Sequence, residues 1–188
     1  QKPFAVTFEK SKKYYNDIIK TNLPVSVNYN FIFLPIFIKF RKIIEKIPYN
    51  QINKYEIKWH FQSYAYKNKV MSWRVNQKKG GGTLNNFGSH IIAIIHNFFG
   101  LAEKVDVLKN NFDWDNYFNN KYNDDVIVNV IHSNKINGSI SICPNVKRKK
   151  ELSITIYTSK YRLKLINISN NHHSGFKIYK FKKNNKKL

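Results

Sequence analysis

GGGTLNNFGSHIIAIIHNFFG, from Gly80 to Gly100, places three consecutive glycines directly before an apolar run, in a chain that has only 7 glycines among 188 residues. Because glycine has no Cβ, such a cluster marks a place where the backbone takes positive φ angles or comes very close to another group. The apolar residues that follow predict a helix from about Gly82 to Phe99, with Gly100 as its C-cap. The glycines are therefore interpreted either as the tight turn that starts this helix or as the wall of a ligand site.

The segments before the glycines predict helices and strands in alternation. Residues 7–20 repeat apolar side chains at helical spacing, and Thr7 is a suitable N-cap. Residues 25–33 are β-rich and alternate, which predicts a strand, and Pro35 then suits the first turn of a second helix. Residues 55–66 predict a long strand with alternating apolar and polar side chains, which is typical of a sheet with one covered face.

The C-terminal half is dominated by short β-rich segments. Two pairs of them are joined by short turn sequences, NKING at residues 134–138 and SK at residues 159–160, which predict antiparallel hairpins. With the helices early in the chain, this order predicts an α+β fold, a large mainly antiparallel β-sheet with helices packed on one face. The other sheet face is expected to be solvated or paired with a partner, and residues 1–188 are interpreted as a single domain. The predicted strands of this half are 104–110, 126–133, 138–144, 152–158, 161–167 and 176–182.

The charge of the chain limits its partners. There are 33 Lys and Arg against 11 Asp and Glu, a formal net charge of +22. Binding to nucleic acid through phosphate contacts needs cations gathered on one face. The lysines are instead scattered along a chain that is also rich in Asn, Ile, Tyr and Phe, so a compositional bias explains the charge better, and nucleic acid is not expected as a partner. The last residues, KIYKFKKNNKKL, are interpreted as a solvated tail.

The cysteine content and the hydropathy of the chain indicate its cellular compartment and whether it crosses a membrane. Cys143 is the only cysteine, which excludes an internal disulfide and a cysteine-based zinc site and fits a reducing, cytoplasmic compartment. The longest apolar stretch, residues 31–38, is far shorter than the ~20 residues that cross a bilayer, and it contains Pro35. We therefore expect no membrane segment, no signal peptide and no bound metal.

Asn86 and His90 are the residues near the glycines that best suit chemistry. In a helix that begins near Gly82 they lie four residues apart and share a face. A histidine titrates near neutral pH, so His90 could exchange a proton with a small ligand held near the glycines. The alternative is a core histidine bonded to a carbonyl group, and the residues alone leave both interpretations open. His60 and His96 are interpreted as structural histidines.

Four segments, in order, resemble the Gfo/Idh/MocA oxidoreductases, the family of glucose-fructose oxidoreductase and inositol dehydrogenase. They are QKPFAVT at 1–7, NYNFIFLP at 28–35, the segment from Ser72 to Gly100, and DDVIVNVIHSNKINGSIS at 124–141. The resemblance implies the C-terminal domain of an NAD- or NADP-dependent enzyme that transfers hydride from a sugar, polyol or sugar nucleotide and forms a homo-oligomer through the open sheet face. It also implies that the N-terminal Rossmann domain, which carries the glycine-rich dinucleotide motif, is absent from this chain.

The same resemblance implies roles for individual residues. Lys2 takes the place of the lysine of the family's E-K-P motif, so it is expected between nicotinamide and substrate, and with Pro3 it is expected to meet the cofactor. His90 takes the place of the family's histidine, a base that removes the hydroxyl proton as hydride leaves, and Asn86 takes the place of its aspartate. A cation such as Lys2 would stabilise the developing alkoxide. The expected catalytic residues are Lys2, His90 and Asn86, and the expected substrate-binding residues are Trp73, Gly81, Gly82, Asn86 and His90.

Several positions depart from the family pattern. Asn86 supplies no charge that would raise the basicity of His90, and Ala93 replaces a second acidic residue. Gln1 replaces the glutamate of E-K-P, and Phe31 stands where relatives often carry arginine. The sequence therefore leaves a second hypothesis, a catalytically inactive homologue that serves as a carbohydrate-binding or oligomerisation module.

Overall fold

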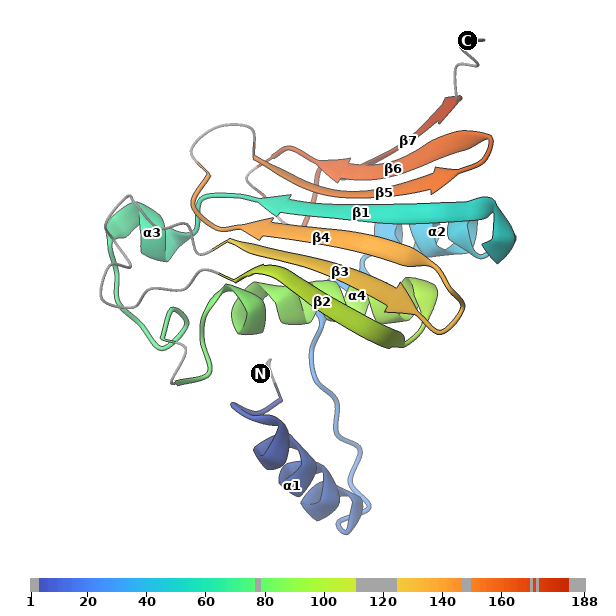
Figure 1. Ribbon diagram of the computed structural model, residues 1–188. Coiled ribbons are helices and arrows are strands. Elements are labelled where there is room, and N and C mark those ends of the chain that lie inside the picture. The colour runs from blue at the N-terminus through green and yellow to red at the C-terminus, as the bar shows by residue number, and fades with distance from the viewer. Residues whose placement is uncertain are drawn as a thin grey trace.

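One mixed β-sheet organises the described part of the chain (Figure 1). The computed structural model describes residues 4–76, 79–110, 125–146, 150–169, 171 and 173–182. Within these ranges the strands are β1 (Ile52–His60), β2 (Ala102–Asn110), β3 (Val126–His132), β4 (Asn137–Cys143), β5 (Glu151–Thr158), β6 (Tyr161–Asn167) and β7 (Lys177–Lys182). Their order across the sheet is β2-β3-β4-β1-β5-β6-β7, and each neighbouring pair is antiparallel except β1 with β4. The expected α+β fold with a large mainly antiparallel sheet is confirmed.

Helices cover one face of this sheet. In the view of Figure 1, α2 (Pro35–Ile44) and α4 (Ser89–Phe99) lie behind the strands. The helix that starts at Pro35 and the helix that ends before Gly100 were both predicted from the sequence and are confirmed. Their buried side chains are Phe37, Phe40, Ile44, Ile91, Ile94, Ile95, Phe98 and Phe99. The other helical segments of the described ranges are α1 (Phe8–Ile19), η1 (Asn30–Phe33), η2 (Tyr49–Gln51), α3 (Tyr64–Asn68) and η4 (Leu84–Gly88).

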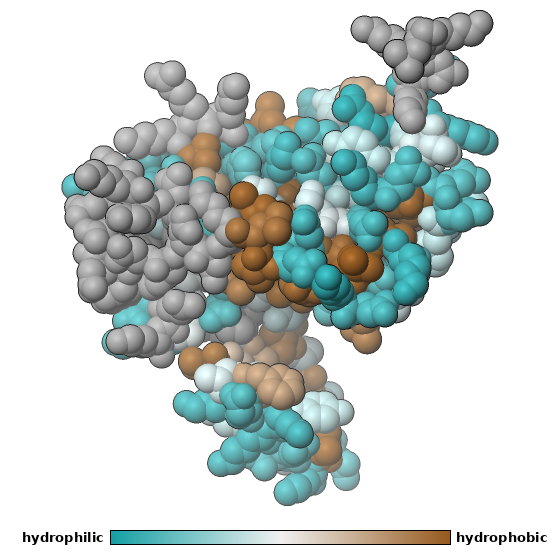
Figure 2. All heavy atoms as spheres, in the orientation of Figure 1, coloured by the Kyte–Doolittle hydropathy of each residue, from teal (hydrophilic) through white to brown (hydrophobic). Residues whose placement is uncertain are grey.

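The helix α1 forms where the sequence predicts it, but it buries none of its side chains. Its N-cap is Thr7, whose hydroxyl oxygen accepts a hydrogen bond from the Lys10 N–H (3.3 Å). The apolar side is exposed, at 77% for Phe8, 61% for Tyr15 and 53% for Ile19. Figures 1 and 2 show the helix standing apart from the sheet, with apolar and polar side chains next to each other. In the ranges that are described, no helix combines the length and hydrophobicity needed to cross a bilayer.

The strand expected over residues 25–33 is wrong. A strand needs a neighbour for its backbone N–H and C=O groups, and no described strand pairs with this segment. Its second part instead forms the short 3₁₀ turn η1. That turn directs Phe31 into the core, where the side chain is 3% exposed and its ring contacts the rings of Phe37 and Trp59. The apolar part of residues 25–33 therefore packs a turn against the core and does not form a strand.

The strand expected over residues 55–66 begins earlier and ends earlier than predicted. β1 stops at His60, and Ser63 starts α3 because its hydroxyl oxygen accepts a hydrogen bond from the Tyr66 N–H (3.3 Å). The predicted alternation is confirmed within the strand, since Ile57 is buried beside half-exposed neighbours.

The two predicted hairpins are confirmed. β3 pairs with β4, and β5 pairs with β6, each pair antiparallel. The strand predicted over residues 176–182 is confirmed as β7, which pairs with β6, so the other interpretation of residues 177–182 as part of a solvated tail is wrong. Residues 183–188 lie outside the described ranges.

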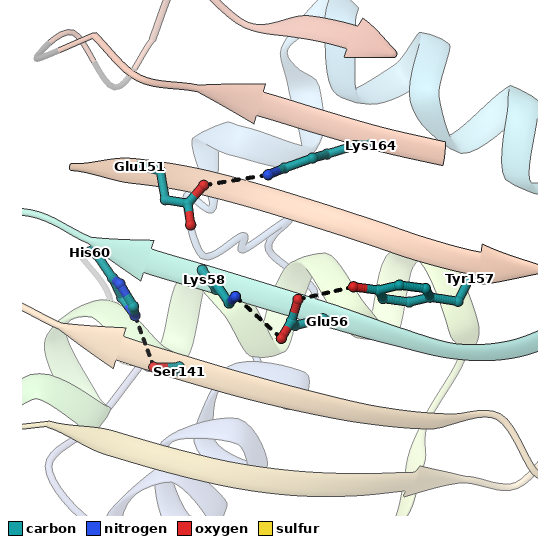
Figure 3. Close-up of polar contacts among 7 residues, drawn as sticks. All are labelled: Glu56, Lys58, His60, Ser141, Glu151, Tyr157 and Lys164. Carbon is teal, nitrogen blue, oxygen red and sulfur yellow. Dashed lines mark hydrogen bonds and ion pairs between the residues drawn. The ribbon is translucent and has the colours of Figure 1, made fainter. Parts of the chain in front are cut away.

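No described helix covers the opposite face of the sheet, which we call the open face (Figure 1). Figure 2 shows hydrophilic and hydrophobic residues on it, and Figure 3 shows polar contacts among seven of its side chains. The Lys58 ammonium lies 3.4 Å from a Glu56 carboxylate oxygen, and the Tyr157 hydroxyl donates a 3.3 Å hydrogen bond to the same carboxylate. His60 Nε2 lies 2.9 Å from the Ser141 hydroxyl oxygen on the neighbouring strand. These contacts join side chains of β1, β4 and β5 across the open face.

A buried polar network ties the end of α4 to the sheet. His132 and Tyr55 are both 0% exposed. His132 Nδ1 lies 2.9 Å from the Gly100 carbonyl oxygen, and its Nε2 lies 2.9 Å from the Tyr55 hydroxyl. Because a carbonyl oxygen can only accept, Nδ1 carries the proton, and a neutral ring then accepts the Tyr55 O–H at Nε2. The Asn134 amide donates to the Phe99 carbonyl (2.9 Å), so side chains from one turn satisfy two carbonyls at the helix end.

Lowering the pH below about 6.5 is expected to destabilise the protein through His132. Burial lowers the pKa of His132, and hydrogen bonds to the Gly100 and Leu101 carbonyls oppose only part of this effect. Between these two pKa values, His132 is therefore protonated in the unfolded state and neutral in the folded state. The free energy of unfolding then falls from pH about 6.5 toward the lower folded-state pKa, by at most about 1.4 kcal/mol per pH unit.

Urea unfolding measured from neutral to mildly acidic pH checks this expectation. The matched variant is His132→Gln, which cannot acquire a charge at the same position. The free energy of unfolding of this variant should depend less steeply on pH. Part of the dependence should remain, because burial also lowers the pKa of His60 and of His96. An equal slope in wild type and variant would exclude His132 as a source of the acid sensitivity.

Candidate functional site

The three glycines hold a tight turn against the segment that precedes them. The Gly81 N–H donates to the Asn76 carbonyl and the Gly82 N–H donates to the Arg74 carbonyl, both at 2.8 Å. A Cβ on Gly81 would lie 2.1 Å from the Trp73 carbonyl oxygen, so only glycine permits this approach. The glycines on either side have φ angles of +80° and +88°. The close contact is thus with the chain's own backbone, and the turn leads directly into a helix.

The helix that follows begins with a wide turn. The segment η4 is a π-helix and continues into α4 without a break. The Asn86 N–H donates to the Gly82 carbonyl at 2.9 Å, so the glycine turn sets the start of this helix. π-Turns inside helices are frequent at functional sites. Asn86 lies in the π segment, and His90 lies in the first turn of α4.

A cavity of about 380 Å³ lies at the start of η4. Gly82 and Asn86, two of the predicted substrate-binding residues, both line it. Trp73, Gly81 and His90 are not among its lining residues. The other lining residues are Phe61, Gln62, Ser63, Tyr64, Ala65, Val70, Ser72, Arg74, Val75, Thr83, Phe87 and Pro144.

His90 lies in an aromatic cluster next to this cavity. Its half-buried ring packs edge-to-face with Phe31, Tyr29 and Trp59, at centroid distances of 5.4, 5.9 and 6.2 Å. Phe87, which lines the cavity, contacts Trp59 at 5.4 Å. A chain of ring contacts therefore connects His90 with the cavity that holds Asn86.

The loop that contains His173 lies against the same cluster. The His173 ring stacks on Phe31 at 6.2 Å, and the Asn30 amide donates to its Nδ1 at 3.3 Å. Phe31 thus contacts both His173 and His90, which are far apart in the sequence. Among the residues that the structure describes, no three His, Cys, Asp or Glu side chains gather closely enough to hold a metal ion.

Arg74 is a site residue that sequence reasoning missed. It lines the cavity, and its guanidinium carbon lies 5.8 Å from the ring centroid of Trp73, which is 41% exposed. The signal was its place beside Trp73, six residues before Gly80, and an arginine there offers hydrogen-bond donors to an oxygen-rich ligand. Lys2 and Pro3 lie outside the described residues, so the structure does not place the expected cofactor contacts.

The sequence also matches a family model over most of its length. Residues 42–186 match the model described as oxidoreductase family, C-terminal alpha/beta domain. The chain belongs to the Gfo/Idh/MocA oxidoreductase family. This confirms the resemblance stated from the four sequence segments.

Solved dehydrogenases share the fold of this family member. The WlbA dehydrogenase from Bordetella pertussis, solved with NADH and UDP-GlcNAcA, matches with a TM-score of 0.75 at 18% identity, over 94% of this chain and 54% of its own. Levoglucosan dehydrogenase, solved with NADH and levoglucosan, matches with a TM-score of 0.72 at 18% identity, over 97% of this chain and 53% of its own. An uncharacterized oxidoreductase of Schizosaccharomyces pombe is 30% identical over 105 residues, which are 56% of this chain and 28% of that protein. The chain spans about half the length of the two solved relatives.

Proposed function

We propose that this chain is the substrate-side domain of an NAD(P)-dependent oxidoreductase that acts on a sugar, polyol or sugar nucleotide by hydride transfer. One observation carries the proposal: a single glycine turn presents Asn86 to a cavity and His90 to the adjoining aromatic cluster. Two dehydrogenases of the same fold were solved with NADH and a sugar or sugar nucleotide, which supports this substrate class.

The proposed roles follow from the chemistry of each side chain. His90 takes the proton of the substrate hydroxyl, because imidazole titrates near neutral pH. The Asn86 amide orients that hydroxyl by hydrogen bonds, and Lys2 stabilises negative charge on the oxygen. Trp73 does not line the Asn86 cavity but contacts its lining residue Arg74, and we assign its exposed ring to a part of the sugar that extends out of the cavity. The nicotinamide, when bound, supplies the hydride acceptor.

The dinucleotide is proposed to be held by an N-terminal Rossmann domain outside this chain, with Lys2 and Pro3 meeting it from this side. Two observations favour such a domain. The solved relatives extend well beyond the matched part, since the chain covers only 54% and 53% of their lengths. The apolar side of α1 is also uncovered, with Phe8 77% exposed, and a further domain packed there would remove this surface from water.

The test uses the complete protein that contains this chain. Binding of NAD and NADP is measured first, and reduction of the bound nucleotide is then followed with a panel of sugars, polyols and sugar nucleotides. Cofactor binding with turnover of at least one member of the panel is expected. A complete protein that binds neither nucleotide would contradict the oxidoreductase proposal.

A catalytically inactive binding or oligomerisation module is the second candidate. It is favoured by the neutral Asn86 and by Ala93, positions where the family resemblance implies acidic residues. This candidate predicts that a sugar binds at the Asn86 cavity while no nicotinamide nucleotide binds. The same binding measurements therefore separate the two functions.

We also propose that the open sheet face mediates homo-oligomerisation. Ile127 projects from this face, since it alternates with the buried, helix-side residues of β3. Ile127→Arg should place an extra cation in the interface and convert the oligomer to monomers, as measured by light scattering of the eluted protein. The matched control is Ile38→Arg, at an exposed position of α2 on the helical side, which should leave the assembly unchanged. Equal masses for wild type and Ile127→Arg would contradict this interface.

A further inference from the structure

A second cavity, of about 750 Å³, lies at the opposite end of β1 from the candidate site. Its walls come from the start of β1, the end of β5, the start of β6 and the end of β7, among them Lys54, Tyr157, Arg162 and Phe181. The candidate site instead adjoins Phe61, just beyond the other end of β1. The two cavities are therefore separate, and nothing in the proposed hydride transfer uses the second one. It lies on β1, β5, β6 and β7 at one end of the open face, so a ligand there requires that the oligomer contact around Ile127 of β3 leaves this end of the sheet uncovered.

The register of the sheet arranges cations and aromatic rings in one row across this cavity. Lys54 pairs with Tyr157, Tyr157 pairs with Arg162, and Arg162 pairs with Phe181. The Lys54 ammonium lies 5.3 Å from the ring centroid of Tyr157, and the Arg162 guanidinium carbon lies 5.3 Å from that of Phe181. Each cation thus rests on a ring, which fixes its position but leaves its charge uncompensated.

The charges of this cavity differ from those on the rest of the open face. Lys54, Arg162 and Lys182 line it, and no Asp or Glu does. In the described ranges none of the three forms an ion pair, whereas Lys58 and Lys164 on the same face pair with glutamates at 3.4 and 3.5 Å. The nearby carboxylate of Glu56 is occupied by Lys58 and by the Tyr157 hydroxyl. The cavity therefore has a concentrated positive charge.

We propose that this cavity binds a small organic phosphate that carries a flat ring, of the nucleoside diphosphate class. The Arg162 fork and the Lys54 ammonium suit phosphate oxygens, because guanidinium groups bind phosphate in a bidentate manner. The Phe181 ring lines the same space and is 41% exposed, so its face away from Arg162 can receive a base, whereas the Tyr161 ring already carries the Lys180 ammonium at 4.1 Å. The proposal rests on the cavity alone and does not depend on the oxidoreductase activity.

Calorimetric titration of the protein with ADP and with inorganic pyrophosphate at physiological salt tests the proposal. Both probes should bind, ADP more tightly. Arg162→Ala should weaken both by about tenfold or more, the loss of a charge-assisted hydrogen bond. Phe181→Ala should weaken ADP more than pyrophosphate, because it removes the ring face for the base as well as the ring that supports Arg162. The matched control is Lys164→Ala, on the same strand and face but paired with Glu151, which should change neither affinity by more than about twofold.

Three results would overturn the proposal. The first is no binding of either probe to the wild-type protein. The second is an equal loss in Arg162→Ala and Lys164→Ala, which would mean that net charge and not the cavity attracts the anion. The third is binding to a long oligonucleotide with none to ADP or pyrophosphate, which would make the surface a contact for nucleic acid.

Discussion

Replacing Gly138 by alanine is expected to cost about 3 kcal/mol or more of unfolding free energy, because the side chain of Tyr55 occupies the space above this glycine. Tyr55 is paired with Gly138 across β1 and β4 and is 0% exposed. A Cβ at Gly138 would lie 1.8 Å from the Tyr55 ring. The ring could not simply move aside, since it stacks on Phe99 at 4.4 Å and its hydroxyl binds His132. Urea unfolding of wild type and variant gives the difference.

A double-mutant cycle identifies the cause of this loss. In a Tyr55→Val background the space above the strand is open, so the added cost of Gly138→Ala should fall to within about 1 kcal/mol. Ser139→Ala, one residue further along β4 and on its other face, is the matched control and should have little effect. A full penalty that persists without the tyrosine ring would mean that strand backbone, and not Tyr55, excludes a side chain at Gly138.

Local signals predicted the parts of the fold in which neighbouring residues make the contacts. Pro35 starts α2, Gly100 ends α4, and the short turn sequences join the strands of both hairpins. The failures have tertiary causes. Residues 25–33 alternate like a strand, but Phe31 is buried by a turn and no described strand offers the segment a partner. Alternation alone cannot distinguish a strand from a turn that buries one of its apolar residues.

The candidate site could be predicted only where its residues are close in sequence. Gly82 and Asn86 lie within one helical turn of each other, and they do share a cavity. His173 could not have been placed beside the His90 cluster, because its hydrogen bond to Asn30 spans 143 residues. Arg74 was within reach of sequence reasoning, since it stands six residues before Gly80, but the turn that folds its backbone against Gly82 had to be seen.

His90→Ala in the complete protein is expected to lower turnover by about 10²-fold or more if the proposed dehydrogenase activity is present. The loss of the imidazole removes the group that takes the hydroxyl proton, so kcat should fall while the affinity for the nicotinamide nucleotide stays the same. The substitution should cause little structural damage, because the His90 ring is only half-buried where it packs edge-to-face with Phe31 and Tyr29. Steady-state kinetics with a substrate found in the panel would measure both quantities.

His96→Ala is the matched control for this variant. His96 lies on the same helix and is also half-buried, but it borders the apolar space between α4 and the sheet, away from the Asn86 cavity. Its removal should change turnover by no more than about twofold. A proton-transfer role for His90 further predicts that the acidic limb of the pH–rate profile, present in wild type and His96→Ala, disappears from the residual activity of His90→Ala. If that limb persists, or if the two variants lose turnover equally, His90 supports the helix and another group takes the proton.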